Sequence, residues 1–508
     1  MSMRSFVLIS RLVLAAGACA SCSENGATAA DAAVDASDPY AALDPRPFGI
    51  FPSNAPLTQP DVTASLQALG LAWMRGAGGQ PTVFWSLVDP DRSGDPARMS
   101  FAGTTTGPAG EPIAFDYDRD IAAALASGVN VMMNLDVAPE PWSSYRVSGS
   151  WLPTNETAYR AFVEATVRRY PGVRVWQVGN EPNAETTPEQ AGLPDPGPAV
   201  RELADFAALQ RITYEAAKSA DPSVLVALGG TVEIVPDRRD DYHDRVLEAL
   251  GGCCVDIFDF HLYGDPVGGM LAPPPNPRLP GYQDIETAAA DFRDRLDERG
   301  FARTRLWITE TASPSGTYRF GPLTLTATES QQARDLPKRW VVALASGVEK
   351  IFWFGMLEGY GAWDDDYFDH VGLIYDGHGG SAGTPKLAYW AYWQMTRQLD
   401  GCRWREVERL TTTVPETRAY RCPLDAGGDV VVAWWDTFNV AGWSEGATTT
   451  ITVPWSSAAA VMRAAVPSAA SGAEVADPAT AFATTNLVPS GGTVTLTLGA
   501  DPVYVRAN

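Results

Sequence analysis

The sequence predicts an α/β protein, a (β/α)₈ TIM barrel followed by a C-terminal antiparallel β-sandwich. Short apolar runs alternate with amphipathic stretches between residues 46 and 400, which indicates βα units and a parallel sheet. After residue 400, short strand-like runs are separated by Gly, Pro, Ser and Asp, a sequence pattern typical of a β-sandwich. The 508 residues suffice for a large barrel and a smaller domain.

The barrel prediction depends on a count of strands. The expected strands are residues 48–51, 71–75, 129–135, 173–179, 224–228, 255–261, 304–310 and 350–354. The expected helices between them include residues 157–169, 203–219, 241–250, 288–299 and 330–346. A doubly wound open sheet is the alternative, but eight strands alternating with helices over about 350 residues favour a closed barrel. The predicted domains are a barrel at 46–400 and a sandwich at 401–508, whose strands include 430–434, 448–453 and 493–498.

Residues 1–22 have the pattern of an export signal. Positive charge precedes the apolar stretch 12–16, which is too short to span a membrane. Cys19 and Cys22 follow small residues, so the segment resembles a bacterial lipoprotein signal in which either cysteine carries the lipid. Ala16 stands where such signals usually have Leu. We expect an exported protein: periplasmic, an outer-membrane lipoprotein or extracellular.

Residues 23–45, rich in Ala, Asp and Ser, are expected to be a disordered tether. The formal charge of −23 disfavours nucleic acids as partners and leaves the lipid anchor as the only expected membrane contact. An oxidising compartment permits a disulfide between Cys402 and Cys422, whereas the adjacent Cys253 and Cys254 are compatible with buried thiols. The oligomeric state is open.

Four motifs place polar or aromatic residues at the ends of expected strands. WQVGNEPN at 176–183 ends the fourth strand with Glu181, and RLWITETASPSG at 305–316 ends the seventh with Glu310. The other two are FDFHLYG at 258–264 and IFWFG at 351–355. Barrel enzymes carry their catalytic groups at the C-terminal ends of the strands, so these motifs are expected to meet.

This set of motifs resembles clan A of the glycoside hydrolases, most closely family 39 and next family 5. The resemblance covers the barrel and the trailing sandwich. In that clan the acid/base Glu lies in an Asn-Glu-Pro motif after strand four, and the nucleophile Glu follows strand seven. By resemblance, Glu181 is the acid/base and Glu310 the nucleophile of a retaining glycosidase, which works with two carboxyl groups about 5–5.5 Å apart.

The resemblance also implies roles for five neighbouring residues. Arg75 would pair with Glu310 and keep it ionised, and Tyr263 would donate a hydrogen bond to the same carboxylate. Asn180 would bind the 2-hydroxyl of the sugar, and His261 would shape the acid/base side of the pocket. Trp353 would lie under the reacting sugar as a stacking platform. The expected substrate is an oligo- or polysaccharide. The resemblance implies a β-linkage, because most enzymes of the clan act on β-linked sugars.

The roles of several other residues have two interpretations. Trp142, Asn134, Asp136 and Trp85 either line a sugar cleft or pack in the core. The acidic run 364–366 suggests calcium, although three consecutive carboxylates converge poorly on one ion, so a solvated loop is preferred. The surrounding loop, 356–384, is expected to overhang the pocket.

We expect no cofactor and no metal, because the four His, at positions 243, 261, 370 and 378, are too scattered for a zinc site.

Three alternatives to hydrolysis stay open. A non-catalytic carbohydrate-binding lipoprotein would keep the barrel without turnover. A transglycosylase would use the same carboxylates with a sugar as acceptor. A surface protein would bind a partner through residues 401–508.

Overall fold

The computed structural model describes residues 39–52, 57, 60–78, 81–106, 110–137, 152–182, 198–231, 242–264, 284–320, 323–359, 366–377, 380–435 and 446–507. The chain divides into two compact units, Met1–Ala42 and Leu43–Asn508. The first contributes a single described turn, the 3₁₀ helix η1 (Pro39–Ala42). The predicted export signal, most of the tether and Trp142 lie outside the described residues. The second unit is described below.

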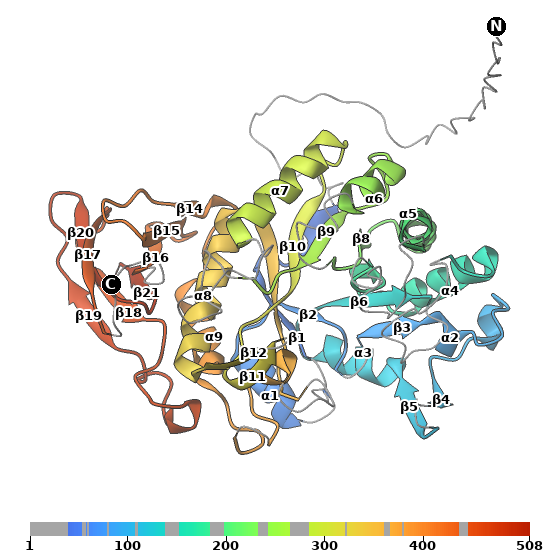
Figure 1. Ribbon diagram of the computed structural model, residues 1–508, viewed down its shortest axis with the longest axis horizontal. Helices are drawn as coiled ribbons and strands as arrows, with labels where there is room; N and C mark the ends of the chain where they lie inside the picture. The colour runs from blue at the N-terminus through green and yellow to red at the C-terminus, as the bar shows by residue number, and fades with distance from the viewer. Residues whose placement is uncertain are drawn as a thin grey trace, which may run out of the picture. The chain divides into compact units, whose positions relative to one another are not determined.

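Eight parallel strands close into a barrel (Figure 1). They are β1 (Phe48–Phe51), β2 (Trp73–Arg75), β6 (Asn130–Asp136), β7 (Val175–Val178), β8 (Leu225–Ala227), β9 (Ile257–His261), β10 (Arg305–Thr311) and β13 (Val348–Phe354). Each pairs with its neighbour in this order, and β1 pairs with β13 to close the ring. A short ninth strand, β3 (Thr82–Phe84), adds to β6. The predicted barrel and all eight predicted strands are confirmed.

Eight helices follow the barrel strands: α1 (Pro60–Ala68), α3 (Tyr117–Ala126), α4 (Glu156–Arg169), α5 (Pro198–Ala220), α6 (Tyr242–Leu250), α7 (Ile285–Glu298), α8 (Glu329–Ala345) and α9 (Leu387–Gln398). Side-chain caps are seen at the starts of α3, α4, α7 and α8, from Asp116, Asn155, Asp284 and Thr328, and Thr328 forms a capping box with Gln331. No helix in the described ranges is both long and apolar enough to cross a bilayer.

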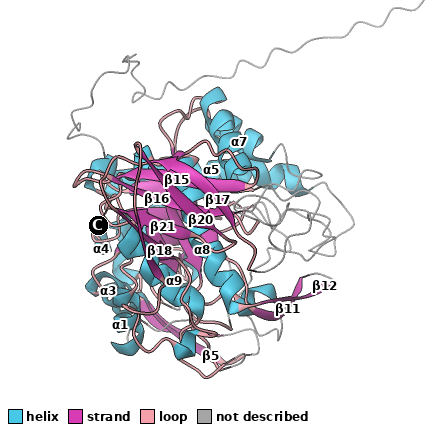
Figure 2. Cartoon of the chain, turned by 90° about the vertical axis from the view of Figure 1, so that its left-hand side faces the viewer, coloured by secondary structure: helices cyan, strands magenta, loops and turns pink. Residues whose placement is uncertain are grey.

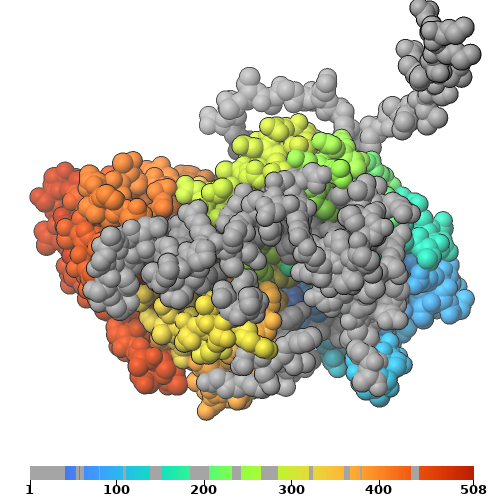
Figure 3. Space-filling view, in the orientation of Figure 1, coloured from blue at the N-terminus to red at the C-terminus, as the bar shows by residue number. Residues whose placement is uncertain are grey.

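Smaller elements fill the connections. They are α2 (Trp85–Val88), η2 (Pro96–Arg98), η3 (Tyr367–His370), and the hairpins β4 (Ala102–Thr106) with β5 (Pro112–Asp116) and β11 (Gly316–Phe320) with β12 (Leu323–Ala327). The second hairpin follows β10, the strand that carries Glu310. This hairpin belongs to the yellow part of the chain, which lies on the face seen in Figure 3.

Side chains alternate along each barrel strand between the inside of the barrel and the helices. Trp73, Trp307 and Phe352 pack edge-on or tilted against one another inside, with ring centroids 5.1 and 6.1 Å apart. Ile308 and Ile351 point the other way, into the large core under the helices. The inward positions toward the strand ends carry polar groups, which form the candidate site.

The described residues after position 400 form a six-stranded and a two-stranded antiparallel sheet (Figure 2). The six-stranded sheet contains β14 (Glu408–Arg409), β15 (Thr417–Pro423), β16 (Asp429–Trp435), β21 (Val503–Arg506), β18 (Ala460–Ala464) and β19 (Thr484–Leu487). The second sheet pairs β17 (Thr449–Pro454) with β20 (Thr493–Leu498). Buried apolar residues of both sheets make one small cluster.

The six-stranded sheet also contacts the barrel helices. Lys338 of α8 lies over the Trp434 ring, 5.5 Å from its centroid, and Arg334 pairs with Asp501 at 2.7 Å. Residues Tyr420, Trp434 and Tyr504 belong to the same core as the barrel helices. The C-terminal segment is therefore continuous with the barrel in its packing.

Cys402 and Cys422, whose bridging the sequence left open, form a disulfide that ties the end of the barrel to β15. Cys253 and Cys254 are unbridged, and burial raises the pKa of the Cys254 thiol.

We expect Cys402→Ser to lower the free energy of unfolding by about 3 kcal/mol, because the bridge restricts a short loop of the unfolded chain. Urea denaturation of the oxidised protein measures this, with Cys253→Ser as the control that leaves the bridge intact. Equal midpoints for wild type and Cys402→Ser would contradict the expectation.

Candidate active site

Glu181 lies just beyond β7 in an uncommon backbone conformation. Its φ of +48° is left-handed, which costs a non-glycine residue free energy that the surroundings must offset. The Glu181 N–H donates to the carbonyl of Gly229, after β8, at 2.9 Å. The side chain is 28% exposed. The loop therefore holds a solvent-accessible carboxyl group at the mouth of the barrel.

Glu310 lies on β10, three strands further round the barrel, and is nearly buried. Its carboxylate forms an ion pair with Arg75 Nη1. Tyr263 Oη donates to the other oxygen, Oε2, at 2.5 Å. Both contacts are those predicted from the sequence. Two directed donors leave this carboxylate little rotational freedom.

Arg75, at the end of β2, links three strands of the barrel, its own strand and the strands β7 and β10. It is 1% exposed. Besides Glu310, it donates through Nε to Gln177 Oε1 at 2.8 Å and through Nη2 to Asn180 Oδ1 at 2.5 Å. A planar guanidinium suits three such partners at once. Because Arg75 occupies the amide oxygen of Asn180, the group that Asn180 offers to a ligand is its N–H donor.

His261, at the end of β9, lies between the two carboxyl groups. Its Nδ1 is 2.6 Å from Glu181 Oε1 and 3.4 Å from Glu310 Oε2. Burial lowers the pKa of His261 to about 3; the charge of Glu310 opposes this shift, and that of Arg75 adds to it. The imidazole is therefore neutral near pH 7 and adds no charge to the site.

Glu181, His261 and Glu310 place one ligand atom each within 4.8 Å of one another. This spacing would also suit a metal ion. However, the Arg75 guanidinium already occupies one oxygen of Glu310, and a second cation beside it would be repelled. The arrangement fits a pair of reacting carboxyl groups better than a metal centre.

Asp259 is a site residue that sequence reasoning missed. It is buried inside the barrel, where it accepts from the Gly229 N–H at 3.0 Å and from the Thr309 hydroxyl at 3.1 Å. Burial raises its pKa, although Arg75 and the hydrogen bonds act in the opposite direction. Asp259 thus fixes the backbone at Gly229, whose carbonyl accepts the hydrogen bond from the Glu181 N–H. A carboxylate inside the apolar run FDFH was the available signal.

The prediction for Trp353 is wrong. Its ring is fully buried, stacks on Trp340 of α8 and donates through Nε1 to the carbonyl of Val371 at 3.0 Å. Strand alternation turns Trp353 toward the helices and its neighbour Phe354 toward the site. Phe354 stacks on Phe51, with ring centroids 4.9 Å apart.

The structure places the residues whose role had two interpretations as follows. Trp85 is fully buried against Tyr159, so it packs in the core. Asn134 is buried beside Gln177 in the strand register, and Asp136 is half-buried at the end of β6. Of the acidic run only Asp366 is described, and it caps η3 through the Phe368 N–H at 3.0 Å.

The fold is similar to that of several solved glycoside hydrolases. A family 39 glycoside hydrolase from Bacteroides cellulosilyticus WH2 matches with a TM-score of 0.61 and 16% identity, over 91% of this chain and 80% of that one. A glucosidase from Croceicoccus marinus matches with 0.56 and 15%, over 92% and 97%. A family 51 arabinofuranosidase from Xanthomonas axonopodis pv. citri matches with 0.53 and 13%, over 91% and 93%.

No protein-family model and no curated protein matches the sequence. At these identities the structural likeness establishes the fold. The resemblance to clan A barrels that the motifs predicted is confirmed at that level.

We expect His261 to stay neutral down to about pH 5, because its pKa in the folded protein lies far below the ordinary 6.5. Between these two pKa values the unfolded chain binds a proton at residue 261 that the folded chain does not. The free energy of unfolding should therefore be unaffected above about pH 6.5 and fall as the pH decreases toward 3.

Imidazole nitrogen NMR shifts measure this directly, with His261→Gln identifying the signal. Titration of that signal near pH 6.5 would show that the burial argument fails.

We expect Gly230→Ala to destabilise the protein and impair the site together. Gly230 has φ +58°, and an added Cβ would overlap His261 Nε2 and lie 3.0 Å from Gln177 Nε2. Gly251→Ala is the matched control, because Gly251 has φ +64° but open space around it. The control should lose only about 1–2 kcal/mol from backbone strain. Equal losses in both variants, measured by denaturation, would contradict the predicted clash.

Proposed function

We propose that this protein is a retaining glycoside hydrolase in which Glu181 is the acid/base and Glu310 the nucleophile. The observation that carries the proposal is the facing pair itself. One oxygen of each carboxyl group lies within 4.8 Å of the other, close to the spacing of about 5–5.5 Å used for double displacement. An inverting enzyme needs about 6.5–9.5 Å, to leave room for a water molecule.

The surroundings assign the two roles. Glu310 is nearly buried and has a cationic partner in Arg75 and a neutral donor in Tyr263. These contacts suit a carboxylate that attacks the anomeric carbon. Glu181 is more exposed and contacts a neutral imidazole. It is placed to protonate the leaving oxygen and then to activate the water that releases the sugar.

Other side chains would orient the sugar. The N–H donors of Asn180 are placed to bind a hydroxyl beside the anomeric centre, a contact that strengthens in an oxocarbenium-like transition state. Phe354, Phe51 and Phe368 form an aromatic wall next to Tyr263. Apolar ring faces of this kind suit the C–H face of a sugar. We infer a carbohydrate substrate, β-linked by analogy with the clan.

The same proposal includes the outer parts of the chain. We infer that the two C-terminal sheets pack as a β-sandwich, supported by their shared apolar cluster, with a barrel at 46–400 and the sandwich at 401–508. We also propose export with a lipid at Cys19 or Cys22. The Cys402–Cys422 bridge supports an oxidising location.

Turnover of a panel of aryl α- and β-glycosides and polysaccharides tests the proposal. We expect Glu310→Ala to lower kcat by at least about 10⁴-fold, and azide to restore turnover with product of inverted configuration. Glu181→Ala should lose most activity on substrates with poor leaving groups and keep more on activated aryl glycosides. Glu298→Ala, on an exposed carboxylate of α7, is the control and should retain wild-type rates.

Binding of a polysaccharide without any cleavage would replace the enzyme with a sugar-binding protein. Transfer to an added sugar acceptor in preference to water would make it a transglycosylase. Wild-type rates in both Glu variants would refute the assignment of the carboxylates.

A further inference from the structure

Glu310 lies where the β-ladder of the barrel loses its regular register. The pairing of β10 with β9 shifts between Ile308 and Glu310, and the pairing with β13 shifts between Ile308 and Thr311. Regular ladder hydrogen bonds therefore do not by themselves define the backbone that carries the carboxylate. A main-chain bond crosses this point, from the Leu262 N–H to the Glu310 carbonyl at 3.0 Å.

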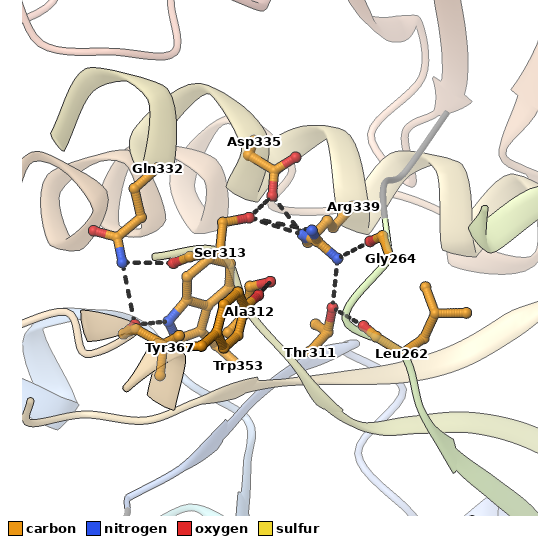
Figure 4. A network of polar contacts seen from close by, with 11 residues as sticks. Leu262, Gly264, Thr311, Ala312, Ser313, Gln332, Asp335, Arg339, Trp353 and Tyr367 are labelled. Atoms are coloured by element: carbon orange, nitrogen blue, oxygen red, sulfur yellow. Dashed lines mark hydrogen bonds and ion pairs between the residues drawn. The ribbon is translucent and has the colours of Figure 1, made fainter. Parts of the chain in front are cut away.

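A buried cation on a helix bonds to the chain at the C-terminal ends of both strands that meet here, β9 and β10 (Figure 4). Arg339 of α8 is fully buried and donates through Nη1 to the Gly264 carbonyl at 2.8 Å and to Thr311 Oγ1 at 2.9 Å. Thr311 directly follows Glu310, and its hydroxyl donates to the Leu262 carbonyl at 2.7 Å. The residues on both sides of Tyr263 are thus bonded to this network, directly or through Thr311.

The network has its own counter-ion and a second anchor. Asp335, one turn before Arg339 on α8, forms the ion pair and also accepts from the Ser313 hydroxyl. Arg339 Nη2 contacts the same hydroxyl at 3.2 Å, and Gln332 donates to the Ser313 carbonyl at 2.8 Å. The segment after Glu310 is thereby attached to α8 at Thr311 and at Ser313.

We propose that Arg339, with Asp335 as its counter-ion, is a positioning residue that sets Glu310 and Tyr263 relative to each other. The inference rests on the proposed function, since it concerns the nucleophile and its hydrogen-bond donor. Arg339 touches neither side chain. It acts through Thr311 and Gly264, the residues that follow each of them. A displacement of about 1 Å at a reacting group can cost about 10²-fold in rate.

The key variant is the double substitution Arg339→Met with Asp335→Leu. Replacing both members of a buried ion pair by apolar residues of similar size is often neutral for stability, so the variant is expected to fold. We expect kcat to fall by about 10²-fold with KM changed by less than about threefold. Arg339→Lys keeps the charge but not the forked donors, so it should lose kcat in the same way.

The matched control is Lys386→Met with Glu358→Leu. This ion pair is as buried as the first, with side-chain exposures of 0% and 2% in both cases. Its lysine bonds to Ser315 and to the His370 carbonyl instead. The control should keep kcat within about threefold of wild type. Wild-type kcat in a folded Arg339→Met/Asp335→Leu variant, or an equal loss in the control, would overturn the positioning role.

Amide hydrogen exchange gives a readout that does not depend on catalysis. Exchange in the peptides covering 257–264 and 305–313 should be faster in the Arg339 variants than in wild type and in the Lys386 control. If wild type cleaves no glycoside, the proposed function fails, and exchange alone decides the positioning inference. Unchanged exchange in these peptides would overturn it.

Discussion

The arrangement of the site depends on one buried guanidinium. Arg75 is almost without solvent contact, yet among the described residues it has one carboxylate as a direct ion-pair partner, and its other donors go to the amides of Gln177 and Asn180. A buried charge with imperfect partners is costly, so the strands that supply these partners must meet at one height in the barrel. That requirement brings Asn180 and Glu310, far apart in sequence, to the two terminal nitrogens of one guanidinium.

Around this cation, the two carboxyl groups are held by different physical means. Glu181 lies in a loop with a left-handed backbone, which is attached to Gly229 and through it to the buried Asp259. Glu310 lies on a strand whose ladder is irregular, and α8 takes part in holding it through Arg339. In both cases a buried ionisable residue, Asp259 or Arg339, bonds to the chain next to the segment that carries the carboxyl group. Preorganisation of this kind lowers the cost of reaching the transition state.

Trp353 and Phe354 show the limit of what a local sequence pattern can predict about side-chain direction. Both aromatics belong to one apolar run, and both are compatible with a sugar-facing position. A shift of one residue in a strand exchanges the inner and outer faces, and β13 pairs Trp353 with Thr311 on the outer face. Trp353 therefore packs on α8, and Phe354 joins Phe51 and Tyr263 at the site.

The sequence by itself determined the eight strands, their order and the two carboxylates at strand ends, because apolar periodicity and strand-end motifs are short-range signals. The tertiary structure alone decided which side chains meet. Arg75 and Glu310 are 235 positions apart, and no local pattern encodes their contact. The roles of Gln177, Asp259 and Arg339 could not be predicted for the same reason. Each depends on a hydrogen bond or ion pair between buried polar groups of different strands, or of a strand and a helix. The distance between such groups is set by the closure of the barrel and the register of its strands.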